Sequence, residues 1–516
     1  MNFTKKQIAQ IENKGITVNK VLKQIETFKS GLPYINLKSA AILGHGIIKT
    51  TEAENNEYTT FYNTQKENLE ILKFVPASGA ATRMFKFLLE FLESYDPKKE
   101  TINGYINKNK ANDLFVFAVG IEKFPFYNIV LNEAKKHVPE FNTLSADAKA
   151  VEFIKTMLNK DRLNYSFSPK GLLPFHKYKD HIATAFEEHL FEAALYATSK
   201  NVATIHFTIS EIYKDIFSKE FKRIKTRVER KTDTKFNISY SYQKEETDTI
   251  AVTIKNEIVK DLDGLLYFRP SGHGALLSNL NDFDADVIFI KNIDNVVVSK
   301  FEKEVAKHKK ILAGILLKEQ QQAFLYLKAL EKEKLKEEKL LEIARFLKNK
   351  LNVIIIDEFE KYAPKYQIEY LKNKLNRPIR ICGMVRNEGD TGGGPFWVKD
   401  ESGTVSLQIV ESAQVDKNNS HQKNILKSAT HFNPVDLVCG IKDYKGRKYD
   451  LSKFVDSKTA FITTKTKTGK DIKALESPGL WNGSMANWNT IFVETPIVTF
   501  NPVKTVTDLL KATHQL

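Results

Sequence analysis

The sequence predicts an α/β fold built on a mixed, mainly parallel sheet. From Leu72 onward, short apolar runs typical of buried strands alternate with segments of helical spacing, as in LKFVPA then MFKFLLEFLESY, and VATIHFTIS then EIYKDIFSKEFKRI. Strand followed by helix, repeated along a chain, is the pattern of a layered α/β protein. A length of 516 residues, with 42% hydrophobic and 27% charged residues, allows a large core and excludes a disordered or disulfide-stapled chain.

The cysteines and the apolar runs predict a cytoplasmic protein without membrane contact. Cys382 and Cys439 lie in separate apolar runs without CxxC spacing, so neither a disulfide framework nor a zinc site is expected. The stretch MNFTKKQIAQIENKG mixes Lys and Glu with single apolar residues, unlike a signal peptide, and no run is long enough to span a bilayer.

The formal net charge of +15 is the unusual bulk property of the chain. Basic proteins bind phosphate backbones, but these lysines are mixed with glutamates, most densely in residues 300–350, which is typical of solvated helix faces. No zinc-finger, helix-turn-helix or RNA-binding signature accompanies them. We therefore expect no nucleic-acid partner, and nucleic-acid binding by the basic helices is kept only as an alternative function. The net positive charge would attract small acidic substrates.

The residue composition and hydrophobic periodicity change along the chain and predict four segments. Residues 1–66 form an N-terminal helical cap, in which Gly31 ends a helix over VNKVLKQIETFKSG. Residues 67–300 form the first part of the core, with an insertion at about residues 95–160. Residues 301–376 are a helical insertion of two or three helices, a candidate surface for homo-oligomer formation, and residues 377–516 complete the core with strands and with hairpins at KDESGTVSLQIVE and DYKGRKYDL.

A small-residue turn between strand and helix is the first candidate site. In FVPASGAATRMFK, Phe74–Lys86, glycine and alanine let backbone approach a ligand, and the helix start offers unpaired N–H groups to phosphate. Arg83 adds a fixed charge with fork geometry. The alternative is a tight packing turn, so the functional interpretation needs partners elsewhere in the chain.

Three downstream motifs supply such partners. SPKGLLPFH frames Lys170 between Pro and Gly, which can aim its ammonium group into a cleft; the alternative is an ordinary turn lysine. RPSGHGALLSNL is another glycine-rich turn that opens a helix. Asp294 follows the apolar strand in FIKNIDNVV, where a carboxylate suits Mg²⁺, unless it merely caps a turn.

These motifs, in this order, resemble the UDP-sugar pyrophosphorylase superfamily, which includes the UDP-glucose and UDP-N-acetylhexosamine enzymes. The segment TFNPVKTVTDLL, Thr499–Leu510, is similar to a segment of the UDP-glucose branch and is the most specific match. The resemblance covers about residues 70–300 and 378–510. It places the chain in a bacterial branch defined as a domain of unknown function, and it implies a GT-A/Rossmann-like nucleotidyltransferase three-layer fold.

The resemblance also implies roles for individual residues. Arg83, Lys170 and Lys504 would be catalytic by neutralising phosphate charge, and Asp294 would hold Mg²⁺. The residues that would bind the nucleotide, with Gln243 reading the uracil edge, are Ala77, Ser78, Gly79, Ala80, Ala81, Thr82, Gln243, Gly272, His273 and Gly274.

The acceptor side rests partly on the resemblance and partly on residue types. Gly383, Glu411 and Asn433 fall near the family's sugar contacts. Trp481 and Asn482 lie in ESPGLWNGSMANWNTIFVE, whose aromatic and amide side chains suit a sugar-like ligand; the alternative is a buried loop satisfied by its Asn side chains.

The implied reaction is transfer of a nucleotidyl group, from UTP by resemblance, to a phosphorylated acceptor, with release of pyrophosphate. A sugar phosphate is already ionised at neutral pH, so the protein needs mainly to position the reactants and neutralise charge. Arginine, two lysines and Mg²⁺ supply that chemistry. The histidines, such as His176 and His431, do not form a spaced metal set.

The chain also departs from the family pattern. Three family glycines in the phosphate loop are replaced, so a catalytically degenerate nucleotide- or sugar-binding protein of the same fold is the alternative function. The spacing between Arg83 and Lys170 is longer than in the family, which makes Lys123 a rival phosphate lysine. The glycines Gly392–Gly394 predict either a lid or a hairpin tip.

Overall fold

The computed structural model describes residues 3–332, 335–389, 392–467 and 469–516, and the chain divides into two compact units. The first unit comprises residues 1–74, 241–290 and 308–496, and the second comprises residues 75–240, 291–307 and 497–516. Both units are assembled from distant parts of the sequence, because the chain leaves the first unit after Phe74 and returns to it twice.

The first unit is built on a mixed, mainly parallel sheet. Its strands follow the order β2 (Ile42–Leu43), β3 (Gly46–Ile48), β20 (Asn489–Glu494), β13 (Ile379–Arg386), β17 (Asp436–Gly440), β12 (Val287–Lys291) and β4 (Ile71–Pro76). The pairs β2–β3, β3–β20, β20–β13 and β12–β4 are parallel, whereas β17 runs antiparallel to β13. The predicted mixed α/β architecture with a mainly parallel sheet is therefore confirmed.

The central strands read as nearly continuous apolar runs because they are covered on both faces. Every residue of β12 and β17 is buried, and only the last residue of β13 is exposed. Their side chains join one core cluster with residues of distant segments, among them Phe74, Trp397, Leu480 and Phe492. The free cysteines Cys382 and Cys439 belong to this cluster and are fully buried.

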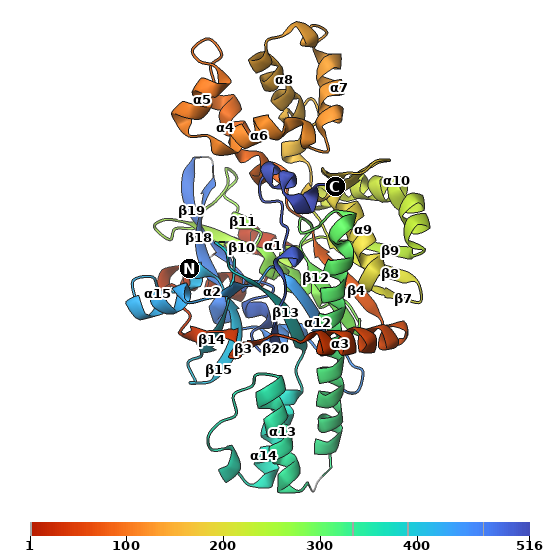
Figure 1. Ribbon diagram of the computed structural model, residues 1–516. Coiled ribbons are helices and arrows are strands. Elements are labelled where there is room, and N and C mark those ends of the chain that lie inside the picture. Colours follow the sequence, from red (N-terminus) through yellow and green to blue (C-terminus); the bar gives the residue numbers. More distant parts are fainter. Residues whose placement is uncertain (1–2, 333–334, 390–391, 468) are drawn as a thin grey trace. The chain divides into compact units, whose positions relative to one another are not determined.

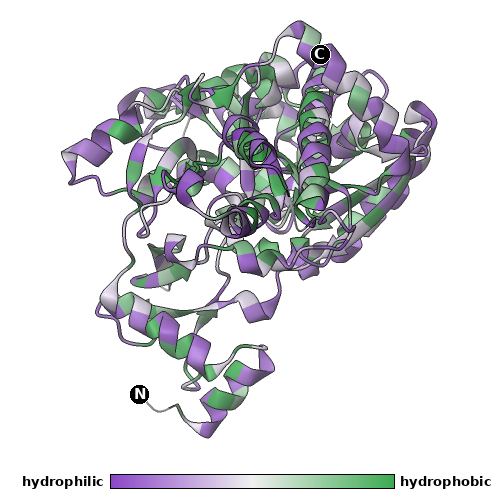
Figure 2. Cartoon of the chain, turned by 90° about the horizontal axis from the view of Figure 1, so that it is seen from below, coloured by the Kyte–Doolittle hydropathy of each residue, from purple (hydrophilic) through white to green (hydrophobic). Residues whose placement is uncertain are grey.

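Two smaller sheets complete the β-structure of this unit. One contains β1 (Leu37–Ala40), β14 (Gly394–Lys399) and β15 (Val405–Val410); the other contains β11 (Phe268–Arg269), β10 (Thr249–Thr253), β19 (Lys470–Glu476) and β18 (Phe461–Lys467). Helices α1 (Lys5–Asn13) and α2 (Val18–Ser30) pack on the second sheet through residues such as Ile25 and Val252. Figure 2 shows the mixture of polar and apolar residues on the helical ribbon nearest the N-terminus.

The helices α12 (Ser299–Leu330), α13 (Glu337–Lys350) and α14 (Pro364–Leu375) form most of the predicted helical insertion. Helices α13 and α14 lie side by side (Figure 1). Within α12, Gly314 allows close approach to α3 (Glu52–Gln65), because a Cβ at this position would lie 2.2 Å from the carbonyl oxygen of Tyr58. The unit also contains α11 (Leu276–Leu280), α15 (Ser420–Lys427) and β16 (His431–Phe432).

The second unit contains two groups of helices and short strands. The inserted helices are α5 (Ile102–Asn109), α6 (Asn112–Gly120), α7 (Tyr127–His137) and α8 (Ala146–Leu158), and they follow α4 (Lys86–Ser94). The remaining elements are β5 (Pro174–Lys177), β6 (Ile182–Thr184), α9 (Ala185–Tyr196), β7 (Thr198–Ser199), β8 (Val202–Thr208), α10 (Lys214–Thr232) and β9 (Lys235–Ser241).

Several local predictions are confirmed. The helix over VNKVLKQIETFKS ends at Gly31, which adopts a φ of 78°, and KDESGTVSLQIVE contributes the hairpin of β14 and β15. The hairpin at DYKGRKYDL is reduced to one isolated bridge between Lys442 and Lys448. Strands β1, β2 and β3 were not expected within residues 1–66, since their partners β14 and β20 come from the distant end of the chain.

Candidate functional site

The predicted phosphate loop and the predicted metal ligand follow two strands that end at the same edge of the sheet. Strands β4 and β12 pair in parallel, so their carboxyl ends share that edge. The loop that starts at Ala77 follows β4, and the turn that carries Asp294 follows β12. The amide of Ile293 donates to the carbonyl of Pro76 at 3.3 Å and joins the two segments. Ligands of open α/β sheets bind at this kind of edge.

The loop Ala77–Arg83 presents exposed backbone and one exposed cation. Ser78, Gly79, Ala80, Thr82 and Arg83 are exposed, whereas Ala77 and Ala81 are buried anchors. Among the residues that the structure describes, no acceptor is found for the amides of Ser78, Gly79 and Ala80. Free amides just before a helical turn, with an arginine beside them, suit an anion.

The Lys170 motif is bonded directly to this loop. The hydrogen bonds run from the amide of Ala81 to the carbonyl of Ser168 (3.0 Å), from the amide of Lys170 to the carbonyl of Gly79 (3.2 Å) and from Oγ1 of Thr82 to the carbonyl of Ser166 (2.8 Å). Two motifs that lie far apart in the sequence therefore form one structural piece.

Lys170 points at Asp294. Its Nζ lies 2.7 Å from Oδ2 of Asp294, and the two side chains are 16% and 18% exposed, so the pair is half-buried and still reachable from solvent. Gly171 allows the approach, because a Cβ at this position would lie 2.9 Å from the side chain of Ile293. The Pro-Lys-Gly frame thus places the ammonium group beside the carboxylate predicted to hold Mg²⁺.

The segment that carries Lys504 is bonded to the same turn. Its hydrogen bonds run from the amide of Val503 to the carbonyl of Asp294 (3.3 Å), from the amide of Asn501 to Oδ1 of Asn295 (2.7 Å) and from Nδ2 of Asn295 to the carbonyl of Thr499 (3.1 Å). Lys504 itself is exposed, with its ammonium group 5.6 Å from the ring centroid of Phe500. The phosphate loop, Lys170, Asp294 and Lys504 therefore belong to one connected set of segments.

Helix α9 supports this set, and the sequence analysis missed it. Nε2 of the buried His189 lies 3.1 Å from the carbonyl oxygen of Ile293, and the buried Glu192 and Lys291 form an ion pair at 2.7 Å. The signal that could have found these residues is the polar face of AFEEHLFEAALY, since charged side chains in an otherwise apolar helix need buried partners.

The side chains around Asp294 offer one carboxylate to the predicted Mg²⁺. Oδ2 of Asp294 is paired with Lys170, while no partner is found for Oδ1 among the described residues. Within the same residues, no group of three or more His, Cys, Asp or Glu side chains could hold a metal. Mg²⁺ is commonly held by one or two carboxylates together with phosphate oxygens and water, so one carboxylate here is sufficient in kind.

The residues predicted to bind the acceptor meet within the first unit. Nδ2 of Asn433 donates to the carbonyl of Gly383 at 3.2 Å, and the amide of Asn433 donates to the carbonyl of Gly393 at 2.8 Å. A Cβ on Gly393 would lie 3.3 Å from Oε1 of Glu411, which accepts from Nδ2 of Asn482 at 3.4 Å. Asp390 and Thr391, in the predicted lid or hairpin tip, lie outside the described residues.

The residues predicted to bind the phosphorylated acceptor show three features of a ligand-binding site. Oδ1 of Asn482 is buried and has no hydrogen-bond partner within the described part of the chain, and burial raises the pKa of the Glu411 carboxyl, opposed by its bond from Asn482. Val435 adopts a φ of 59°, which β-branched residues rarely do, and its amide donates to Oδ1 of Asn433 at 3.0 Å. Such backbone strain gathers at functional sites.

Trp481 and His273 lie together in the same unit. Their rings stack with centroids 4.2 Å apart, and the amide of Leu480 donates to Nδ1 of His273 at 3.0 Å. Burial lowers the pKa of His273 to about 4. A Cβ on Gly274 would lie 2.0 Å from the carbonyl oxygen of Pro478, so packing against this loop explains the glycine, and the nucleotide contact of Gly272–Gly274 stays a prediction.

Two further predicted residues make hydrogen bonds of their own. Nε2 of Gln243 donates to Oγ1 of Thr247 at 3.4 Å, and its role in reading a base stays a prediction. Lys123 is exposed on the short helix Ile121–Lys123, and its carbonyl accepts from Nε2 of Gln515 at 3.5 Å.

One carboxylate at the end of a buried strand was not predicted. Glu494 closes β20, lies 3.0 Å from Nζ of Lys49 and lies 3.4 Å from Nε2 of His431. Its register partner on β13 is Met384, which follows Gly383. The position of Glu494 directly after the apolar residues Ile491–Val493 is the signal that could have identified it.

Within the described residues, no single helix is long and apolar enough to cross a bilayer. The helices Asn112–Lys123 and Tyr127–His137 reach that length and hydropathy only together, and they are bent by 92° at their junction.

Comparisons with known proteins give structural similarities and a family. Solved structures similar to this chain include a UDP-glucose pyrophosphorylase mutant of Leishmania major in complex with UDP-glucose (12% identity, 99% of this chain and 79% of that chain, TM-score 0.43). A UDP-glucose phosphorylase of Trypanosoma brucei (13%, 98% and 77%, TM-score 0.45) is also similar. So is the UDP-N-acetylglucosamine pyrophosphorylase of Trypanosoma brucei in complex with an inhibitor (10%, 98% and 79%, TM-score 0.45).

No curated protein sequence matches the chain significantly. A family model matches residues 4–515, which is nearly the whole chain. The protein therefore belongs to the family described as a domain of unknown function, DUF4301.

Proposed function

We propose that the protein is a nucleotidyltransferase of GT-A type that acts in the cytoplasm. It transfers a nucleotidyl group, uridylyl from UTP, to a phosphorylated small-molecule acceptor such as a sugar phosphate and releases pyrophosphate. The observation that carries the proposal is the convergence of the exposed loop Ala77–Arg83, Lys170, Asp294 and the Lys504 segment through direct hydrogen bonds and one ion pair. Cations and free amides around one carboxylate are what a triphosphate requires.

In the proposed mechanism, a phosphate oxygen of the acceptor attacks the α-phosphorus of the triphosphate. A new oxygen–phosphorus bond forms as the bond to the β-phosphate bridging oxygen breaks, and pyrophosphate leaves with the electron pair. Loop amides and Arg83 bind phosphate oxygens, while Lys170 and Lys504 neutralise the charge that develops on the leaving group. When bound to Asp294 and the triphosphate, Mg²⁺ would add further charge neutralisation.

The group Gly383, Glu411, Asn433 and Asn482 supports an acceptor site of hydrogen-bonding character. The buried Oδ1 of Asn482, which has no partner within the described residues, and the partly buried carboxylate of Glu411 can both accept hydrogen bonds from a ligand, which suits one rich in hydroxyl groups.

Thermal stability against UTP, ATP, GTP, CTP and dTTP with Mg²⁺ tests the nucleotide part of the proposal. A ligand that binds only the folded state adds about 2.7 kcal/mol of stability at one hundred times its Kd, so UTP should raise the melting temperature. Lys170→Ala and Asp294→Ala should abolish the rise, whereas Lys219→Ala, an exposed lysine on α10, should keep it. Loss of the rise in Lys123→Ala instead would favour the rival lysine.

Pyrophosphate release with a panel of sugar phosphates tests the chemical step. Release that depends on one acceptor would support a transferase. A UTP-dependent shift without release from any acceptor would select the degenerate binding protein of the same fold. No shift with any nucleotide would overturn the proposal.

A further inference from the structure

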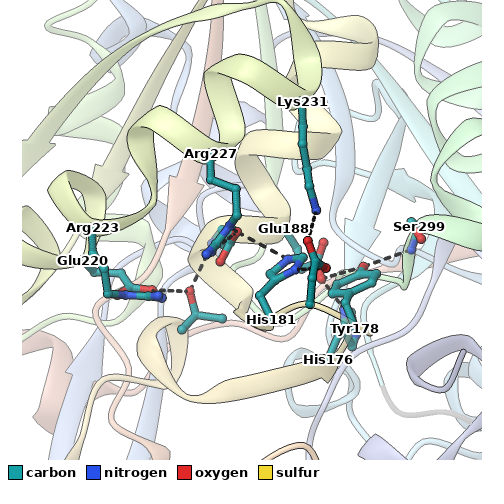
Figure 3. A network of polar contacts seen from close by, with 12 residues as sticks. His176, Tyr178, His181, Glu188, Glu220, Arg223, Arg227, Lys231 and Ser299 are labelled. Atoms are coloured by element: carbon teal, nitrogen blue, oxygen red, sulfur yellow. Dashed lines mark hydrogen bonds and ion pairs between the residues drawn. The ribbon is translucent and has the colours of Figure 1, made fainter.

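Three buried side chains, His176, Glu188 and His514, and the partly buried Tyr178 form a continuous hydrogen-bonded network in the second unit, which we call the histidine hub. His176, Glu188 and His514 are 0%, 1% and 2% exposed. Figure 3 shows His176, Tyr178 and Glu188 converging with the backbone of Ser299. None of the motifs considered above required these residues.

The contacts within the hub are short and directional. Nδ1 of His176 lies 2.7 Å from Oε1 of Glu188, and the hydroxyl of Tyr178 donates to the same oxygen at 2.9 Å. Nε2 of His176 lies 2.9 Å from Nδ1 of His514, so one ring donates its N–H to the other. Both nitrogens of His176 are thus used, and its ring orientation is determined on two sides.

The hub joins the three segments that carry the proposed phosphate and metal residues. Within each segment, a hub contact follows the proposed site residue closely: His176 follows Lys170, the amide of Ser299 that donates to the hydroxyl of Tyr178 at 3.1 Å follows Asp294, and His514 follows Lys504. The fourth contributor, Glu188, comes from α9, whose neighbouring His189 bonds to the carbonyl of Ile293.

The segment 497–516 is held on both sides of Lys504. Before it, the amide of Val503 donates to the carbonyl of Asp294; after it, the amide of Val298 donates to the carbonyl of Thr513 at 3.0 Å. Leu510 packs against Gly120, where a Cβ would lie 2.4 Å from its side chain. In this part of the segment, His514 adds a buried side-chain hydrogen bond that favours one position, because apolar packing alone tolerates sliding. The neighbouring Gln515 makes a longer one, 3.5 Å, to the carbonyl of Lys123.

Burying two imidazole rings away from water costs more than burying hydrocarbon rings of the same volume, because the ring nitrogens need hydrogen-bond partners. The presence of two buried histidines therefore points to a role for their hydrogen bonds. Each buried ring nitrogen that loses its partner costs more than the hydrogen bond itself is worth. The arrangement therefore favours a single register between the segments strongly, and displaced registers leave several polar atoms unpaired at once.

We propose that the histidine hub is a positioning device that fixes the segment carrying Lys504 against those carrying Lys170 and Asp294. His514 and His176 are positioning residues that act through Lys504 and do not touch the substrate. The effect on catalysis through Lys504 rests on the proposed function. The clamping of residues 497–516 does not depend on it.

Hydrogen–deuterium exchange of the full chain tests the clamping. In His514→Ala, the amides of Asn501, Val503 and Val298 should exchange about tenfold faster, because a buried bond is lost and the segment opens more often. His514→Asn, whose Oδ1 can accept the hydrogen bond from Nε2 of His176 in place of Nδ1, should restore much of the protection. His137→Ala, an exposed histidine on α7, is the matched control and should leave exchange at these amides unchanged. Unchanged exchange in His514→Ala would overturn the proposal.

A double-mutant cycle tests the action through Lys504. His514→Ala should lower kcat of pyrophosphate release about tenfold with little change in KM, and it should have no further effect in the Lys504→Ala background. Effects that add in the double variant would overturn the catalytic part of the inference. If the wild-type protein releases no pyrophosphate from any acceptor, the proposed function fails, and the exchange experiment alone still decides whether the hub clamps the segment.

Discussion

Glu188 is a carboxyl group in a dry environment, and burial raises its pKa to about 8, with Tyr178 opposing the rise and the charge of Glu187 adding to it. Burial also lowers the pKa of His176 to about 3 and that of His514 to about 3. A neutral Glu188 would donate to Nδ1 of His176, which leaves Nε2–H to donate to His514. The hub is then an uncharged chain near neutral pH.

The pKa of Glu188 predicts a pH dependence of stability. Because the folded-state pKa is raised from 4.5 to about 8, the native state binds more protons than the unfolded state between these values. The contribution of Glu188 to the free energy of unfolding is fully present below pH 4.5. It is lost as pH rises through 8, at up to about 1.4 kcal/mol per pH unit. Glu188→Gln keeps a neutral hydrogen-bonding group and should remove this loss. Denaturant unfolding from pH 5.5 to 9 checks it; parallel profiles for both proteins would contradict the assignment.

The buried histidines predict the opposite slope at lower pH. Their neutral forms are favoured in the folded state, so their contribution is present above pH 6.5 and is lost as pH falls toward 3. His176→Phe, measured by unfolding between pH 4 and 6.5, should show a shallower acid loss than the wild type. The exposed His137→Phe should keep the wild-type slope.

At the acceptor group, substitutions should separate binding of the two substrates. Asn482→Ala and Glu411→Ala each remove an acceptor of hydrogen bonds, so KM for the phosphorylated acceptor should rise about tenfold with the UTP-induced thermal shift intact. Steady-state kinetics alongside the thermal shift measures both. An equal loss of the UTP shift would show that this group serves the nucleotide.

Among the elements, α12 shows how tertiary packing overrides local propensity. Replacing a helical glycine by alanine normally stabilises a helix by about 1 kcal/mol. At Gly314 the new Cβ would lie 2.2 Å from the carbonyl of Tyr58, so Gly314→Ala should instead destabilise the protein by about 1–3 kcal/mol.

The matched control for α12 is Gly104→Ala in α5. There the nearest atom to the new Cβ is Oγ1 of Thr101 at 3.4 Å, so the ordinary propensity gain should appear. Chemical denaturation of both variants measures whether each substitution raises or lowers the free energy of unfolding. A stabilised Gly314→Ala would mean that α12 and α3 can separate without cost.

For the whole molecule, self-association through the helices of residues 301–376 stays a prediction. These helices and their connections expose large apolar side chains, including Tyr366 at 60% and Leu325 at 55%. If they form an interface, Tyr366→Glu should convert an oligomer to a monomer in light scattering coupled to gel filtration. Tyr34→Glu, also 60% exposed, is the control outside these helices. A wild-type monomer at high concentration would contradict the prediction.

Local patterns were sufficient for much of the fold. The α/β class, the helix that ends at Gly31, the helices of 301–376 and the hairpin of β14 and β15 all follow from hydrophobic periodicity and turn residues, which act over short distances. The order of the motifs also pointed to the loop Ala77–Arg83, Lys170, Asp294 and Lys504, whose segments are connected in the structure and whose roles stay predictions.

Several features depend on pairing between distant segments and could not be predicted from local sequence patterns. Strands β1 and β3 are too short to show a pattern, and they exist because partners from the distant end of the chain satisfy their backbone. The role of α9 and the histidine hub likewise depended on tertiary structure, since a buried His or Glu is distinguished from an exposed one only by the side chains that surround it. The sequence by itself thus determined the fold class and the chemical types at the site, whereas the tertiary structure decided which of these groups meet, because burial and hydrogen-bond partners come from residues hundreds of positions away.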